Sequence, residues 1–339
     1  MITRVCKIFL TARLQQVCTR MNCQKEVQLN ILSKNEAWAL FKDKAGVEDD
    51  SPTLKVAKEF ARECNGLPLT IVTVAKALKG KNLNGWIAAN QRFKDSRHSD
   101  NQDVCGGIYS LGLSYDYLEN DNIQSCFLLC SLFLEDYVIK IEMLIICEIG
   151  QELFSNVDSI EVLRREIHEA VTTLQQSSLL LKAYDEESVK MHDVIRDFGH
   201  LIVSRGENRF MVKDGLMKRS ISESFECCTT ISLWNIEINH LPNKVKFSKL
   251  KILFLKGKKS LRVPCAFFER MTTLRVLLLQ DVVFTLEALQ FLANLLTLCF
   301  INCKLQNISS LRNVENLEVL ALLQTNIQEL PEEFVELLN

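Results

Sequence analysis

Thirteen cysteines and five histidines have the widest chemical range in this sequence, because thiols and imidazoles can bind metals, attack substrates or carry protons. The cysteines are odd in number and irregularly spaced, and no two form a C-x-x-C pair. That spacing argues against a disulfide framework and supports a zinc site poorly. Cys126 and Cys130 stand four residues apart in an apolar stretch, which favours buried thiols on one helix face. No Ser/His/Asp set or carboxylate pair stands out, so the sequence predicts no catalytic centre.

Composition indicates a folded chain of two or three domains. The 339 residues are 47% hydrophobic and 24% charged, with a formal net charge of −2. A chain so close to neutrality is not drawn as a whole to nucleic acid or to an anionic membrane. The opening apolar run is too short for a signal peptide or a membrane span. We therefore expect a reduced, cytoplasmic setting, or one at the inner face of the plasma membrane, and no transmembrane segment.

A leucine pattern repeats in the last third of the chain. Six-residue segments such as "LKILFL" and "LRVLLL" start at positions 228, 250, 274, 295 and 317, which are 22, 24, 21 and 22 residues apart. This period is typical of leucine-rich repeats, and coincidental leucine clustering in a helical domain is the weaker alternative. In each copy the first, fourth and sixth residues are predicted to face the core. They are Cys228, Ile231 and Leu233; Leu250, Leu253 and Leu255; Leu274, Leu277 and Leu279; Leu295, Leu298 and Phe300; and Leu317, Leu320 and Leu322.

Before the repeats, the first hundred residues predict one strand and then helices. Residues 5–11 form an apolar run typical of a buried strand in a parallel sheet. Ser33 followed by Glu36 predicts a capped helix over 33–46. Ser51 with Pro52 predicts the start of another, ending near Gly66. Further expectations are a buried helix over 67–80 and a polar loop over 94–103.

The stretch from 108 to 203 predicts a second helical group. Four helical segments are followed by a strand, an acidic turn, a strand and a helix, which suggests a winged-helix unit. The candidate helices carry mixed charge, so no nucleic-acid role is predicted. Residues 206–227 are rich in Ser and Lys and are expected to link this unit to the repeats.

The order of these blocks resembles the nucleotide-binding region of plant NB-ARC disease-resistance proteins with leucine-rich repeats. The resemblance rests on "CKIFLTAR" (6–13), "LSKNEAWALFKDKAG" (32–46), "CNGLPLTIVTVAKAL" (64–78), "CFLLCSLFLEDY" (126–137) and "KMHDVIRDFG" (190–199). The fourth block points to the coiled-coil rather than the Toll-receptor-like branch. Two departures are Ala12, where the family has a hydroxyl, and Leu134, where it has proline.

The resemblance implies a switch that ADP holds closed and ATP opens into a signalling oligomer. Arg13 would face the γ-phosphate, Pro68 would pack on the adenine, and His192 would contact the β-phosphate of ADP. Gly66, Leu67 and Leu69 are expected to belong to the nucleotide-binding site with Pro68. Met191 and Asp193 are expected to belong to it as well, where they would position the turn around His192. Without the resemblance, the same residues read as a solvated charge, a proline at a helix start and a capping histidine.

The phosphate-cradling loop G-x-x-x-x-G-K-[ST] does not occur in this sequence. We therefore expect the chain alone to bind ADP or ATP weakly or not at all, and not to hydrolyse ATP. The expected role is a component of an innate immune receptor, with a nucleotide-independent interaction module as the alternative. Protein partners, a pathogen effector or a guarded host protein, are expected on the repeats, whose outward strand residues include Ile252, Phe254, Lys256, Arg275 and Leu278. The first repeats are expected to clamp the winged-helix unit.

The fold class expected is a multidomain α and α/β chain: a remnant nucleotide-binding strand, a helical bundle, a winged-helix subdomain and a leucine-rich repeat solenoid. The expected boundaries are 1–24 for the remnant of an N-terminally truncated nucleotide-binding subdomain, 25–103 for the helical subdomain, 104–205 for the winged helix, 206–227 for the linker and 228–339 for about five repeats.

Overall fold

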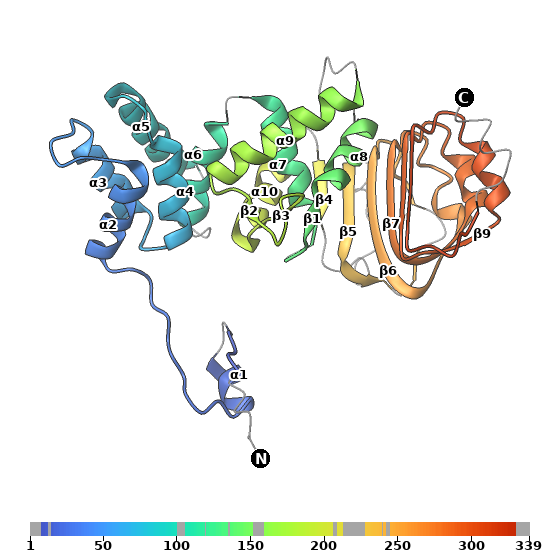
Figure 1. Ribbon diagram of the computed structural model, residues 1–339, viewed down its shortest axis with the longest axis horizontal. Coiled ribbons are helices and arrows are strands. Elements are labelled where there is room, and N and C mark those ends of the chain that lie inside the picture. Colours follow the sequence, from blue (N-terminus) through green and yellow to red (C-terminus); the bar gives the residue numbers. More distant parts are fainter. Residues whose placement is uncertain are drawn as a thin grey trace.

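Two helical units and a parallel sheet follow one another along the chain in the computed structural model (Figure 1). Helices α2 to α6 make the first helical unit, and α7 to α10 with three short strands make the second. The parallel sheet occupies the opposite end of the molecule from α2 and α3. The structure describes residues 8–12, 15–99, 106–118, 120–134, 136–151, 159–205, 209–212, 228–238, 240–241 and 245–329.

The first helical unit packs around Phe41, Phe60 and Trp86, which are almost fully buried. Its first helix has the predicted capping box: the Ser33 hydroxyl accepts from the Glu36 amide, and the Glu36 carboxylate accepts from the Ser33 amide. These contacts satisfy amides at the helix start that have no partner within the helix. The helices of this unit are α2 (Lys34–Ala45), α3 (Leu54–Glu63), α4 (Pro68–Leu78), α5 (Leu83–Ser99) and α6 (Gly106–Asp116).

Two helix boundaries differ from the prediction. Helix α3 begins at Leu54 rather than Pro52, because the Ser51 hydroxyl binds Thr53 within a turn that precedes the helix. Helix α5 continues to Ser99, so the loop expected from residue 94 is wrong for residues 94–99. Polar composition alone does not exclude a solvent-facing helix.

The second helical unit contains a small antiparallel sheet of order β1-β3-β2. The strand, acidic turn and strand predicted after residue 178 are present as β2 and β3, which pair through Lys182 and Val189. The elements are α7 (Asp121–Ser131), β1 (Ile139–Lys140), α8 (Ile141–Gln151), α9 (Ile160–Gln176), β2 (Leu181–Lys182), β3 (Ser188–Lys190) and α10 (Asp193–Arg205).

The larger sheet is parallel throughout, in the order β10-β8-β7-β6-β5-β4. The leucines predicted to be in phase lie on neighbouring strands in register, as Leu253, Leu277, Leu298 and Leu320 do. The strands are β4 (Arg209–Val212), β5 (Cys228–Ile238), β6 (Ile252–Val263), β7 (Val276–Thr285), β8 (Thr297–Ile301), β9 (Lys304–Gln306), which pairs with β7, and β10 (Val319–Leu323).

Short 3₁₀ helices return the chain between strands, as a period of about 22 residues requires: η2 (Cys265–Phe267), η3 (Leu286–Phe291) and η4 (Ile308–Asn313). The first, fourth and sixth positions of the first four copies are buried between these segments and the strands, as predicted. Those of the fifth copy, Leu317, Leu320 and Leu322, pack against the same core but are partly exposed.

Two expectations outside these units fail. Residues 8–12 form no strand, and Ile8 and Phe9 are about nine-tenths exposed, at 89% and 92%. A strand needs neighbours for its amides and carbonyls, and no described strand pairs with this segment; the rest of the predicted strand, 5–7, lies outside the described residues. The following helix α1 (Gln15–Arg20) buries no residue and lies apart from the body (Figure 1). Within the expected linker, Arg209–Val212 forms β4, because β5 offers an unpaired edge to it.

Candidate functional site

The turn before α4 is held by Gly66. Its φ of +69° is left-handed, and a Cβ atom here would lie 2.4 Å from the Leu32 carbonyl oxygen. The Leu32 amide donates to the Gly66 carbonyl at 2.9 Å. Only glycine fits so close to another backbone segment. Leu32 was not predicted to take part, since a backbone contact leaves no mark on the side-chain type.

Pro68 occupies the first position of α4 and is exposed. A proline is favoured there because the amide it lacks would have no partner within the helix. Leu67, before it, is 38% exposed. Leu69, after it, is partly buried and packs against the hydrophobic cluster of the second helical unit. The turn therefore presents a rigid apolar ring to solvent while Leu69 anchors it.

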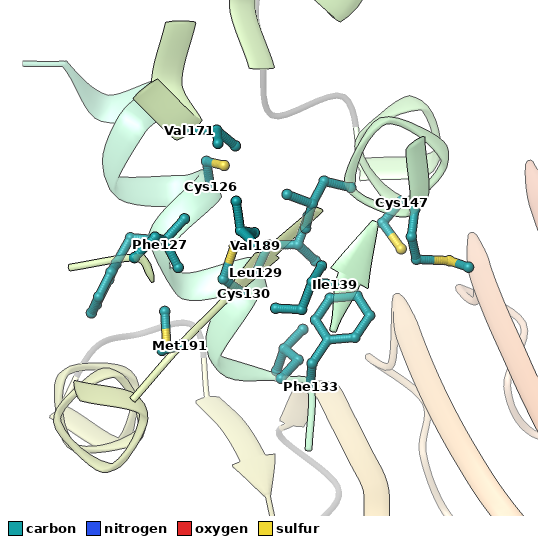
Figure 2. Close-up of a cluster of buried hydrophobic side chains, with 14 of the residues drawn as sticks. Cys126, Phe127, Leu129, Cys130, Phe133, Ile139, Cys147, Val171, Val189 and Met191 are labelled. Atoms are coloured by element: carbon teal, nitrogen blue, oxygen red, sulfur yellow. The ribbon is translucent and has the colours of Figure 1, made fainter. Parts of the chain in front are cut away.

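The second predicted motif lies between β3 and α10. Met191 is buried in the cluster of the second helical unit, where Figure 2 shows it with Phe127 and Cys130. His192 is exposed, with 42% of its side chain accessible. Its Nδ1 atom accepts from the Val194 amide at 3.2 Å, and the same amide donates to Oδ1 of Asp193 at 2.8 Å. Nδ1 and this Oδ1 atom lie 2.5 Å apart. The buried methionine fixes the turn, and the imidazole faces outward.

Both turns border one hydrophobic cluster, which extends from α6 to the sheet: Met191 belongs to this cluster and Leu69 packs against it. Arg13 lies outside the described residues. The described residues contain no group of three or more His, Cys, Asp or Glu that could hold a metal ion. Among them there is also no helix long and apolar enough to cross a membrane.

A hollow of about 640 Å³ lies elsewhere, where α2, α4 and α9 end. The carbonyl ends of helices carry partial negative charge, which lysines in the last turn offset. Lys44 also binds Asp43 at 2.9 Å, and this contact lowers the pKa of the Asp43 carboxyl. The hollow therefore matches helix capping rather than the predicted nucleotide motifs. Its lining residues are Asp43, Lys44, Lys76, Lys79, Gln176 and Ser177.

The predicted partner surface of the sheet is largely covered. Ile252, Phe254 and Leu278 are buried at 3%, 0% and 0% exposure, within the cluster of the second helical unit. Lys256 and Arg275 are half-buried. The prediction that the first three are free for a separate partner is wrong, because the strand pattern identifies a face of the sheet but not what covers it. The covering residues belong to the same chain.

This junction between sheet and second helical unit is close and mostly apolar. Gly150 of α8 lies against the sheet: a Cβ atom on it would be 2.4 Å from Cγ2 of Val276. Two side-chain hydroxyls of the sheet donate to the helical unit, Ser232 to the Leu132 carbonyl at 2.7 Å and Thr297 to the Ile146 carbonyl at 3.2 Å. The expected clamp of the first strands on this unit is thus present.

Comparison with known proteins gives the chain a family context. Residues 2–51 match the NB-ARC domain family. The chain as a whole is related to disease resistance proteins of Arabidopsis thaliana. It is 34% identical to the probable disease resistance protein At4g27220 over 93% of this chain and 34% of that protein.

Two further relatives show the same extent of similarity. The disease resistance protein At4g27190 is 33% identical over 98% of this chain and 35% of its own length. The disease resistance protein UNI is 33% identical over 80% of this chain and 32% of its own length. The chain therefore spans about a third of the length of these relatives.

Proposed function

We propose that this chain is a component of a plant immune receptor in which ADP and ATP set the state of a switch. In this proposal α6 and the second helical unit together form a winged-helix subdomain, and the parallel sheet is a leucine-rich repeat solenoid. The domain boundaries are those expected from the sequence, with β4 joining the solenoid. The proposal draws on the relatives, which are named disease resistance proteins.

The observation that carries the proposal is the shared cluster beneath the two turns. Leu69 and Met191 both pack on it, and so do Ile252, Phe254 and Leu278 of the sheet. A nucleotide that contacted Pro68 and His192 would shift residues that rest on the same close-packed side chains as the sheet. Close-packed interiors transmit such shifts rather than absorb them.

The residues present fit part of a nucleotide. Pro68 offers an exposed apolar ring suited to a base, and His192 offers an exposed imidazole suited to a phosphate oxygen. Arg13 is proposed to sense the γ-phosphate, since a guanidinium keeps its charge and donates in a fork. The sequence lacks the phosphate-cradling loop, so we expect binding by this chain alone to be weak and ATP hydrolysis to be absent.

The test is to titrate the full chain with ADP and with AMP while following the ring signals of His192 by NMR. We expect ADP to shift these signals in the millimolar range and AMP to shift them less, because AMP has no β-phosphate. Equal shifts with both nucleotides, or none at His192, would contradict the role proposed for this residue. Micromolar affinity for ADP by calorimetry would contradict the argument from the missing loop.

The alternative is an interaction module that works without nucleotide. The main proposal also includes protein partners, a cytoplasmic location and oligomerisation on activation. Once a partner is identified, capture by the full chain should weaken on substitution of His192 if the switch controls binding. Equal capture by His192→Ala and by the control His240→Ala, at an exposed histidine of the sheet region, would favour the alternative.

A further inference from the structure

The turn that ends α1 brings two cysteines together. The Asn22 amide donates to the Thr19 carbonyl at 3.2 Å, and the Cys23 amide donates to the Cys18 carbonyl at 3.1 Å. Asn22 is left-handed, with a φ of +49°. These two nested hydrogen bonds around a left-handed residue define a Schellman motif, in which the side chains joined by the outer bond commonly pack on each other. In this turn both of those side chains are thiols.

The outer hydrogen bond also limits how far apart Cys18 and Cys23 can be. With standard backbone bond lengths it holds their Cα atoms within roughly 7 Å of each other. A disulfide needs Cα atoms about 4.4–6.8 Å apart. The pKa of the Cys18 thiol is raised by desolvation and then by the neighbouring Cys23 and Glu26, which agrees with a Cys23 side chain beside it.

These two thiols can also be reached from solvent. Cys18 and Cys23 are free and partly exposed, a degree of exposure that only Cys265 shares among the described cysteines. Cys126 and Cys130 provide an internal contrast, because they lie four residues apart on α7 but are 0% and 1% exposed. A dissolved oxidant therefore meets the pair on α1 and not the pair on α7.

We infer that Cys18 and Cys23 form a dithiol that closes to a reversible disulfide by exchange with a small-molecule disulfide such as glutathione disulfide. One cysteine thiolate attacks glutathione disulfide, whose S–S bond breaks and releases one glutathione. The second cysteine thiolate attacks the resulting mixed disulfide at the protein sulfur and releases the other glutathione. The two thiols lose two electrons and two protons, and glutathione disulfide takes up both to become two glutathiones.

The bond would stabilise a segment that has little else to hold it. Helix α1 has six residues and buries none of them, and a helix so short is not stable alone. The Gln15 side chain donates to the Glu26 carboxylate at 3.3 Å, so the chain turns back along α1 after Cys23. A disulfide would fix this turn covalently. In a reducing compartment the bond would be transient, so the modification can be reversed.

The experiment places the full chain in buffers with a rising ratio of glutathione disulfide to glutathione. Free thiols are then blocked with N-ethylmaleimide under denaturing conditions, and the chain is digested with trypsin without reduction. Trypsin cleaves after Arg20, so the disulfide would join peptide 14–20 to peptide 21–25. We expect mass spectrometry to detect this linked pair at rising ratios, while Cys126 and Cys130 stay free. Separate glutathione adducts on Cys18 and Cys23, with no linked pair, would overturn the inference.

Two substitutions of Asn22 test whether the turn is the cause. Asn22→Gly keeps the left-handed conformation available and should keep the linked pair. Asn22→Val places a β-branched residue where φ is positive, and should lower the ratio of disulfide to dithiol about tenfold. Because α1 buries no residue, both variants should leave the rest of the protein folded. Equal linkage in the two variants would show that the turn does not bring the thiols together and would overturn the inference.

Discussion

The second helical unit has two neighbours, and its two junctions differ in kind. Toward the sheet, it contributes Phe133 and Tyr137 to an aromatic group completed by Trp234 and Phe254, with ring centroids 5.2 to 5.7 Å apart. Toward the first helical unit, the contact includes a polar bond from Lys76 to the Ser178 hydroxyl at 2.7 Å. The hollow lined by Asp43, Lys44 and Lys79 borders that second contact.

The difference indicates which parts move together. An interface with a continuous hydrophobic core behaves like the interior of a domain, whereas a polar, partly open one permits relative motion. Leu111 of α6 joins the cluster of the second unit and Leu113 joins that of the first. Helix α6 therefore links both units, and we expect any hinge to lie there rather than between α8 and the sheet.

The largest effect is expected from Phe254→Ala. Phe254 is fully buried in the aromatic group, and truncating such a ring costs about 3–5 kcal/mol of the free energy of unfolding. Leu69→Ala, at the partly buried contact of the first unit, should cost much less. Urea unfolding of both variants measures this, and equal losses would show that the two junctions do not differ.

Glu148 should make stability fall as the pH rises. Burial raises the pKa of its carboxyl to about 8, and both oxygens lack a hydrogen-bond partner among the described residues. Cys126 and Cys147 are the titratable neighbours with which it interacts. In the unfolded chain this carboxyl ionises at its ordinary pKa of 4.5. Between that pH and about pH 8 the folded protein holds a proton that the unfolded chain has lost. The free energy of unfolding therefore declines over this range and levels off above it.

The free energy of unfolding should decline by a few kcal/mol in total, at a slope of at most about 1.4 kcal/mol per pH unit. Glu148→Gln, which imitates the protonated form, should flatten the profile in urea unfolding between pH 5 and 8.5. Glu142→Gln on the exposed face of the same helix, where Glu142 binds Arg164 at 2.8 Å, is the control and should keep the slope. If the slope is unchanged in Glu148→Gln, the pH dependence of stability arises from other groups.

Gly150→Ala tests how closely α8 approaches the sheet. The added methyl would meet Val276 at 2.4 Å and Thr297 at 2.9 Å, and such overpacking costs about 1–3 kcal/mol. Gly112→Ala in α6 is the matched control, since its nearest neighbour is a Phe198 ring atom at 3.9 Å. Thermal unfolding should show a loss of stability for Gly150→Ala and none for Gly112→Ala. If neither variant loses stability, the junction rearranges to accommodate the added methyl group.

The smallest effect is expected at the polar junction. Lys76→Met removes the bond to Ser178 and should cost about 1 kcal/mol. It should also increase hydrogen exchange in α6 without changing exchange in β6–β8. Lys42→Met on α2 is the control: it removes an ion pair with the exposed Asp49 and should leave hydrogen exchange in α6 unchanged. Faster exchange in β6–β8 of Lys76→Met would indicate that the sheet depends on the first junction.

Much of the fold follows from the sequence, because some features are local. The leucine phase sets which strand residues face the core, and Ser33 with Glu36 caps a helix by contacts within four residues. The cover over Ile252, Phe254 and Leu278 is not local: it includes Phe133, just after α7, and helix α8, more than a hundred residues earlier. A strand pattern carries no information about such a partner.

The candidate site divides in the same way. The types of Gly66 and Pro68 reflect local backbone needs, and the structure bears out a left-handed glycine and a proline at the helix start. The nucleotide roles of Pro68, His192 and Arg13 rest on resemblance and stay predictions. The burial of Glu148 had a signal in the sequence, a lone acid within "MLIICEIG", but periodicity alone does not separate a buried acid from a solvated one.

Native-state hydrogen exchange of the full chain in increasing urea tests most directly whether the sheet and second helical unit form one body. Each amide then reports the free energy of the opening that exposes it. We expect α8 to share its opening free energy with β6, β7 and β8, and α2 to α4 to open separately. If α8 instead opens with α2 to α4 while β6–β8 stay protected, the apolar junction does not hold the sheet to the second unit.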